Sequence, residues 1–201
     1  RAKLTPDYPF GCKRILFANN WYSTIAKPNV SLITETIAGI EPDGVRTSDG
    51  VLHPADALVW GTGFAATDYL NSIEVVADGH SLDEVWADGA TAHLGITVPG
   101  FPNFFILYGP YTNLGGSSII AMLEAQTRYV VQAVQHLSAV GPISVRAEVA
   151  RAWEVEMQDR LSGSVWSRCD NWYREANGKI TTNWPGQVRE FQDRTAHFDA
   201  A

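Results

Sequence analysis

Residues 56–66, Asp-Ala-Leu-Val-Trp-Gly-Thr-Gly-Phe-Ala-Ala, are the stretch that decides how this chain is interpreted. The continuous, mostly apolar run at 56–60 ends at a glycine, which is typical of a short strand buried inside a sheet. Residues 61–66 then match GxGxxA, the pattern that brings a helix N-terminus to a dinucleotide pyrophosphate. The long amphipathic helix that this pattern needs does not follow, because residues 67–72 show no sustained helical period. We therefore favour a tight turn after a buried strand over an independent Rossmann unit.

Turn residues and apolar periodicity predict the other elements. The expected strands are residues 29–33, a hairpin of Ile37–Ile40 with Val45–Thr47, and a second buried strand at 104–108. The expected helices are a turn near Leu82–Trp86, a long helix from Ser117 or Ser118 to about Leu137, and a helix over 145–161. Gly141-Pro142 ends the long helix, and the tail after 161 is predicted to be an ordered loop followed by a short helix.

Composition excludes several classes of function. The net charge of -7 argues against a general nucleic-acid or membrane-surface binder, and no apolar run is long enough to span a membrane. The five histidines show no metal-ligand spacing, so no metal site is expected. Cys12 and Cys169 lie far apart in the sequence, which predicts two reduced thiols in a cytoplasmic protein.

Several motifs accompany the glycine turn in a fixed order. They are Gly11-Cys12-Lys13-Arg14, residues 95–105, Tyr108-Gly109-Pro110-Tyr111-Thr112-Asn113, Asn171-Trp172-Tyr173 and Asn183-Trp184-Pro185. Together they resemble the C-terminal part of the Baeyer–Villiger and flavin-containing monooxygenases, especially the branch that oxidises aryl ketones such as 4-hydroxyacetophenone. In such flavoproteins a strand ending in Ala-Thr-Gly-Phe marks the return of the chain to the FAD domain. Gly61 replaces that alanine in this sequence.

The resemblance implies an α/β fold: the C-terminal part of a flavoprotein with two Rossmann-like dinucleotide-binding domains, followed by a helical, loop-rich extension. Residues 1–28 would be the linker from the NADPH domain, 29–140 the C-terminal portion of the FAD-binding domain, and 141–201 the extension. The GxGxxG and FxGxxxHxxxW signatures of the family are absent from these 201 residues, so we expect them upstream of Arg1.

The function that the resemblance implies is a Baeyer–Villiger oxidation with FAD and NADP as cofactors. A C4a-peroxyflavin would insert one oxygen atom from O2 into a ketone, and the N-terminal part of the same polypeptide would hold most of the flavin. The isolated chain should be inactive, should bind flavin weakly at most, and should self-associate through unpaired strand edges. The alternatives are an N- or S-oxidising flavin monooxygenase, a non-catalytic binding module and a pyridine-nucleotide disulfide oxidoreductase.

The resemblance also assigns roles to individual residues. Arg14 would stabilise the negative charge of the peroxyflavin, because its guanidinium stays charged and presents donors in a rigid fork. Lys13 would lie near the 2′-phosphate of NADPH. From the residues alone, a solvated basic turn after Gly11 is the favoured interpretation of the pair, and the resemblance reverses this preference.

Further cofactor contacts are expected from two turns and from the tail. Gly61, Thr62 and Gly63 form the turn after the first buried strand. Gly109, Pro110, Thr112 and Asn113 precede a helix whose N-terminus would face the flavin, where the positive helix end favours negative charge. Trp172 would pack on the NADP ribose and nicotinamide side. The alternatives are an ordinary strand–turn–helix connection for 109–113 and a core tryptophan at 172.

Overall fold

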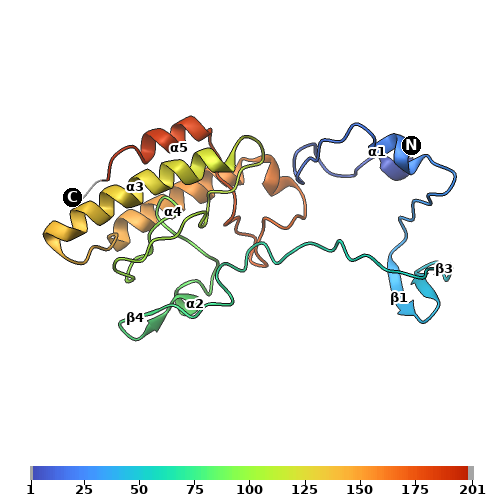
Figure 1. Cartoon of the computed structure of the whole chain (residues 1–201), viewed down its shortest axis with the longest axis horizontal. Coiled ribbons are helices and arrows are strands. Elements are labelled where there is room, and N and C mark those ends of the chain that lie inside the picture. Colours follow the sequence, from blue (N-terminus) through green and yellow to red (C-terminus); the bar gives the residue numbers. More distant parts are fainter. Residues whose placement is uncertain (1, 199–201) are drawn as a thin grey trace. The chain divides into compact units, whose positions relative to one another are not determined.

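The computed structural model describes residues 2–198 and divides them into two compact units. One unit contains the residues up to Asp7 together with Leu16–Phe64, and the other contains Tyr8–Ile15 together with the residues from Ala65 onwards. Figure 1 labels their elements. The predicted domain boundaries at residues 28 and 140 stay predictions.

The first unit is built around a small antiparallel sheet. Its strands are β1 (Ile37–Glu41), β2 (Gly44–Thr47) and β3 (Leu52–Pro54), in the order β1-β2-β3, and two short helices, η1 (Ala2–Leu4) and α1 (Trp21–Ile25), precede them. The predicted hairpin is confirmed. Gly44 sits where a Cβ atom would lie 2.2 Å from the His53 carbonyl oxygen, so only glycine lets β2 and β3 approach each other there.

Two strand predictions in this unit are wrong. Residues 29–33 and 56–60 form no strand, and the side chains of Val59 and Trp60 are 96% and 66% exposed. A continuous apolar run becomes a buried strand only when other strands pair with it and both of its faces are covered. Among residues 2–198 no segment pairs with 56–60.

Three helices form the core of the second unit. They are α3 (Ile119–Val140), α4 (Ala147–Ser162) and α5 (Val188–Arg194), with the short η2 (Val165–Arg168) after α4. All were predicted except η2. Ser118 occupies the N-cap position of α3 but makes no side-chain capping bond. At the other end Gly141 has a φ of 85°, a conformation that favours glycine, and the helix ends there.

The helices pack on one apolar core because their buried residues recur at helical spacing. Met122 and Tyr129 of α3 and Met157 of α4 are buried in it. Trp184 is 1% exposed and stacks on Trp153 at a centroid distance of 5.9 Å, as expected for a packing tryptophan.

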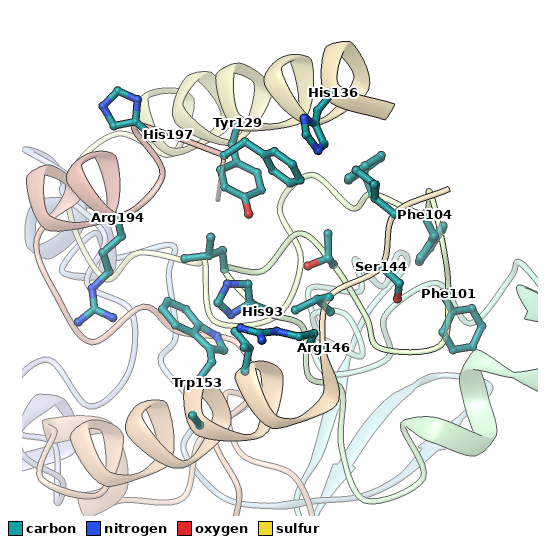
Figure 2. Close-up of a pocket in the computed structure, with 18 of the residues that line it drawn as sticks. His93, Phe101, Phe104, Tyr129, His136, Ser144, Arg146, Trp153, Arg194 and His197 are labelled. Atoms are coloured by element: carbon teal, nitrogen blue, oxygen red, sulfur yellow. The ribbon is translucent and has the colours of Figure 1, made fainter. Parts of the chain in front are cut away.

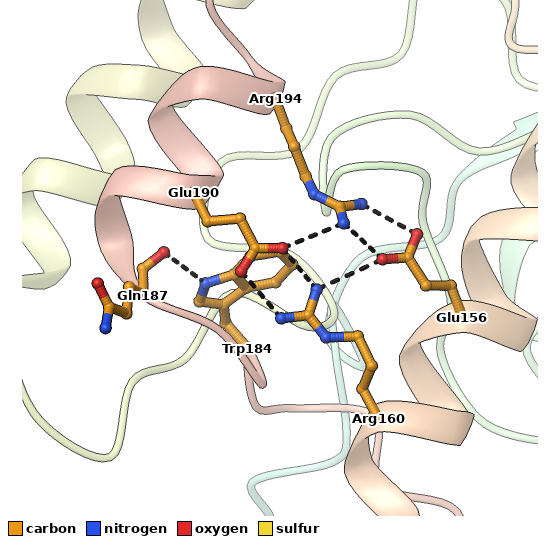
Figure 3. A network of polar contacts seen from close by, with 6 residues as sticks. All are labelled: Glu156, Arg160, Trp184, Gln187, Glu190 and Arg194. Carbon is orange, nitrogen blue, oxygen red and sulfur yellow. Dashed lines mark hydrogen bonds and ion pairs between the residues drawn. The ribbon is translucent and has the colours of Figure 1, made fainter.

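An ion-pair network fastens α4 to α5 over the Trp184 ring (Figure 3). Arg160 of α4 donates to both carboxylate oxygens of Glu190 of α5 at 2.7 and 2.9 Å. Arg194 of α5 donates in turn to Glu156 of α4. The Arg160 guanidinium lies 5.1 Å from the centre of the Trp184 ring, so the charges cover the apolar core at this edge.

A second apolar cluster surrounds α2 (Leu82–Val85), the helical turn predicted from the sequence. The strands β4 (Val76–Ala77) and β5 (His80–Ser81) precede it, and a capping box between Ser81 and Glu84 starts it. The predicted strand at 104–108 is wrong, because Tyr108 has a φ of 60°, outside the range of a strand. Ile106 from this segment nevertheless packs in the cluster.

Candidate functional site

A pocket of about 280 Å³ lies beside the turn that leads to α3. The residues lining it come from four separate segments of the second unit: Arg14, Ala66, Tyr69, Tyr108, Asn113, Trp172, Tyr173 and Thr182. Three of the residues singled out in the sequence, Arg14, Asn113 and Trp172, therefore share one pocket.

Arg14 is held at this pocket by the loop before α3. Its Nη1 donates a hydrogen bond of 3.0 Å to the carbonyl oxygen of Leu114, which is itself buried. A guanidinium has five N–H donors in a planar fork, and this bond uses one of them. The segment just before α3 thus orients a fixed positive charge at the pocket.

Asn113 is fixed by four hydrogen bonds. Its side chain accepts from the Tyr108 hydroxyl at 2.8 Å and donates to the side chain of Asn183. Its backbone N–H donates to Thr182 at 2.9 Å, and its carbonyl accepts from Trp184 at 2.8 Å. The tail motif around 183–185 therefore positions the turn before α3.

Gly109, Pro110 and Thr112 are buried and shape this turn without lining the pocket. The Thr112 hydroxyl donates to the Gly109 carbonyl oxygen at 2.6 Å. A Cβ atom on Gly109 would lie 2.4 Å from the carbonyl oxygen of Gly95. These three residues shape the turn, and their contact with a cofactor stays a prediction; of the four predicted residues at 109–113, Asn113 lines the pocket.

The other predicted cofactor residues are distributed differently. Lys13 does not line the pocket, and its ammonium lies 4.7 Å from the centre of the Tyr8 ring. Trp172 is 47% exposed, so the alternative of a core tryptophan is wrong. Gly61, Thr62 and Gly63 are exposed and belong to the first unit, and their cofactor role stays a prediction.

Three tyrosines of the pocket were assigned no role from the sequence, although two of them belong to the quoted motifs. Burial raises the pKa of Tyr69, Tyr108 and Tyr173, and the Arg14 charge opposes this rise for Tyr108 and Tyr173. All three stay protonated near neutral pH and present aromatic faces and hydroxyl donors. Only the neighbouring motifs, Tyr108 before Gly109 and Tyr173 after Trp172, could have indicated two of them.

A disulfide between Cys12 and Cys169 corrects the expectation of two reduced thiols. Cys12 is two residues before Arg14, Cys169 is three residues before Trp172, and the side chain of Asn171 donates towards both sulfur atoms. Sequence separation predicts nothing about distance in the fold, which is why the expectation failed. The bond ties the segment carrying Arg14 to the tail that carries Trp172.

Comparisons with known proteins decide the family. No family model matches the chain. A Baeyer–Villiger monooxygenase of Streptomyces coelicolor is 41% identical over the whole chain, and one of Pseudomonas aeruginosa is 38% identical. The chain belongs to the Baeyer–Villiger and FAD-binding monooxygenase family. It spans 40% and 39% of the length of these two relatives.

Solved structures of monooxygenases share this fold. A steroid monooxygenase bound to NADP matches 95% of the chain with a TM-score of 0.83 at 29% identity. A cyclohexanone monooxygenase from Rhodococcus sp. Phi1 bound to NADP+ matches 97% with a TM-score of 0.86 at 28% identity. The chain covers 38% of each of them, so it forms part of the monooxygenase fold, a mixture of helices and small sheets. Among the helices of residues 2–198, none is both long and apolar enough to cross a membrane.

The pocket has side chains of the types that a flavin ring would contact, and one solved relative, OTEMO, is a complex with FAD and NADP. A flavin ring has carbonyl acceptors at one edge and a large flat face. Arg14 brings charged donors that match the carbonyl edge of a flavin. Trp172 and the tyrosines bring aromatic faces that match the flat face of the ring.

Proposed function

We propose that this chain supplies one side of the active site of an FAD- and NADPH-dependent monooxygenase that inserts an oxygen atom from O2 into a ketone. The observation that carries the proposal is the meeting of Arg14, Asn113 and Trp172 at one pocket. The relatives named as Baeyer–Villiger monooxygenases support the choice of a ketone as the substrate class.

Arg14 is the catalytic residue in this proposal. When bound, reduced flavin supplies the electrons that activate O2. Arg14 stabilises the negative charge that develops beside the flavin ring, and the Leu114 carbonyl keeps its guanidinium in place before the reaction begins. Preorganised donors of this kind lower a barrier because they need no reorientation when the charge forms, and losing one costs about 10²–10³ in kcat.

Asn113 and Trp172 have positioning roles. Asn113 is fastened to the tail by Thr182, Asn183 and Trp184, so it holds the start of α3 against the pocket. Trp172 offers a half-exposed ring on which the nicotinamide side of NADP packs. Lys13 recognises the 2′-phosphate of NADP as a point charge. Its ammonium group, which lies over the Tyr8 ring in this structure, would move away from that ring to do so.

A chimera tests the function directly. This chain would replace the matched 40% of the Streptomyces coelicolor enzyme, to which it is 41% identical. We expect the chimera to retain FAD and to convert a ketone to an ester with NADPH and O2. A chimera that retains FAD but oxygenates only amines or sulfides would replace the ketone assignment by heteroatom oxidation. One that retains FAD and oxygenates neither class would favour a non-catalytic module.

The 201-residue chain alone should behave differently. We expect no monooxygenase activity and at most weak FAD binding, because the predicted GxGxxG cradle is not in its sequence. The exposed side chains of Val59, Trp60 and Phe64 favour self-association. Fluorescence titration with FAD and analytical ultracentrifugation measure both, and tight FAD binding by the chain would contradict the expectation. A cytoplasmic location stays a prediction, and the disulfide is unusual for that compartment.

A further inference from the structure

A second and larger pocket, of about 770 Å³, lies at the other end of α3 (Figure 2). Four parts of the second unit line it. They are the loop residues within 93–105, the second half of α3, the segment from Pro142 into the first half of α4, and the end of α5 with the residues that follow it. It shares no residue with the Arg14 pocket.

Trp153 places an unused donor in this pocket. The residue is 5% exposed, and its Nε1 is buried with no hydrogen-bond partner in the described part of the chain. Figure 2 shows the indole nitrogen directed into the pocket. An indole N–H can only donate, and a buried donor without a partner costs about 1–3 kcal/mol. An acceptor atom of a ligand would remove this cost.

His93 adds a second polar atom of the same kind. Its ring packs edge-on against Trp153 at a centroid distance of 5.6 Å, and its Nδ1 is buried and unpaired within residues 2–198. Burial lowers the pKa of His93 to about 4, so the ring is neutral near pH 7. The pocket therefore has two neighbouring polar atoms, Trp153 Nε1 and His93 Nδ1, for which residues 2–198 provide no partner.

Arg146 supplies the positive charge. It occupies the N-cap position of α4, and Figure 2 shows its side chain extended into the pocket beside Trp153 and His93. Its ion pair with Glu148 has an N–O distance of 3.6 Å between two exposed side chains, so it holds the guanidinium weakly. Arg194, the other arginine of the pocket, is committed to the α4–α5 network.

Aromatic and aliphatic side chains form the rest of the wall. Phe101, Phe104 and Val140 line one side, and Tyr129 and Phe198 pack together at a centroid distance of 5.4 Å on another. A pocket of this volume with a few convergent polar groups is typical of a small-molecule site. The apolar walls suit a hydrocarbon chain or ring.

We propose that this pocket binds a small amphipathic carboxylate, whose carboxylate group meets Arg146 and the Trp153 indole N–H while its apolar body lies against the phenylalanines. Because this pocket shares no lining residue with the Arg14 pocket, the proposal does not rest on the flavin reaction. A carboxylate matches the donor set because both Arg146 and the indole donate, and charge-assisted bonds of this kind are the strong ones.

Titration of the 201-residue chain with octanoate tests the proposal. The readouts are calorimetry and the ¹H–¹⁵N resonance of the Trp153 indole, which Trp153→Phe identifies. We expect octanoate to shift this resonance, and octanamide, its neutral counterpart, to bind about tenfold more weakly or worse because the charge-assisted bond is lost.

Two arginines of the same region provide the matched variants. Arg146→Gln should weaken octanoate binding by about tenfold or more, whereas Arg151→Gln, an exposed α4 position that does not line the pocket, should leave it unchanged. Both are surface changes, and equal melting temperatures confirm that the fold is kept. An unmoved Trp153 resonance, equal binding of octanamide, or equal effects of the two substitutions would overturn the proposal.

Discussion

Removing the Cys12–Cys169 disulfide should destabilise the chain and loosen the segment that carries Arg14. The two cysteines are separated by 157 positions, so the cross-link closes a very long loop in the unfolded chain. In the chain-entropy model a loop of this length corresponds to about 5 kcal/mol at 25 °C, which is an upper value because unfolded chains keep residual structure.

The structure indicates which segment becomes more mobile when the disulfide is removed. Besides the disulfide, the contacts between Tyr8–Ile15 and the rest of the second unit include the Arg14 bonds to Leu114 and Tyr173 and the Asn171 contact with Cys12. Without the cross-link, only non-covalent contacts hold the segment. Arg14 should then become mobile while the helical core stays folded.

Urea unfolding followed by circular dichroism measures the effect. The Cys12→Ser, Cys169→Ser double variant should unfold at a midpoint lower by up to about 2 M, taking about 2–3 kcal/mol per M for the urea dependence. A reducing agent should lower the midpoint of the natural chain to that of the variant and leave the variant unchanged. This reasoning would be refuted by two free thiols in the unreduced, unfolded chain. It would also be refuted if the reducing agent left the urea midpoint of the natural chain unchanged.

Three further outcomes follow from single sites. Glu190→Gln should cost up to about 1 kcal/mol at pH 7 and progressively less in acid, because Arg160 lowers the pKa of Glu190 and stability from such a carboxylate is lost as pH falls through its folded-state pKa. A series of urea curves from pH 7 into the acid range checks this. Gly95→Ala should destabilise by about 2 kcal/mol more than Gly100→Ala, since both glycines have positive φ but only the first would bring a Cβ atom to 2.2 Å from a neighbour; thermal melts compare them. Trp172→Ala in the chimera should raise KM for NADPH with stability changed by no more than about 0.5 kcal/mol, and an unchanged KM would remove the nicotinamide role.

Local signals in the sequence predicted the local structure. The hairpin at β1 and β2 has its turn residues, and α3 and α4 have apolar residues at helical spacing, so these elements are where they were expected. The strand at 56–60 was wrong because burial depends on neighbouring strands, and the described residues offer none. The predicted strand at 104–108 was wrong for a different reason. Tyr108 has a left-handed backbone conformation, which the apolar run does not encode.

The candidate site divides in the same way. The grouping of Arg14, Asn113 and Trp172 came from the family resemblance, since no spacing rule joins residues that lie so far apart in the sequence. The same resemblance could have predicted the disulfide, because Cys12 and Cys169 flank two of these residues. The larger pocket, which contains Trp153, gave no signal in the sequence, because its polar groups come from a loop and from the first half of α4, which meet only in the fold.

The measurement that tests the central claim is the coupling of NADPH oxidation to ketone oxygenation in the chimera carrying Arg14→Gln. With Arg189→Gln, an 82% exposed arginine, as control, we expect only the Arg14 change to lower the kcat of ester formation, by about 10²–10³. FAD should be retained and NADPH should still be consumed. If the Arg14→Gln chimera makes ester as fast as the control, Arg14 does not act on the flavin and the assignment of this pocket fails.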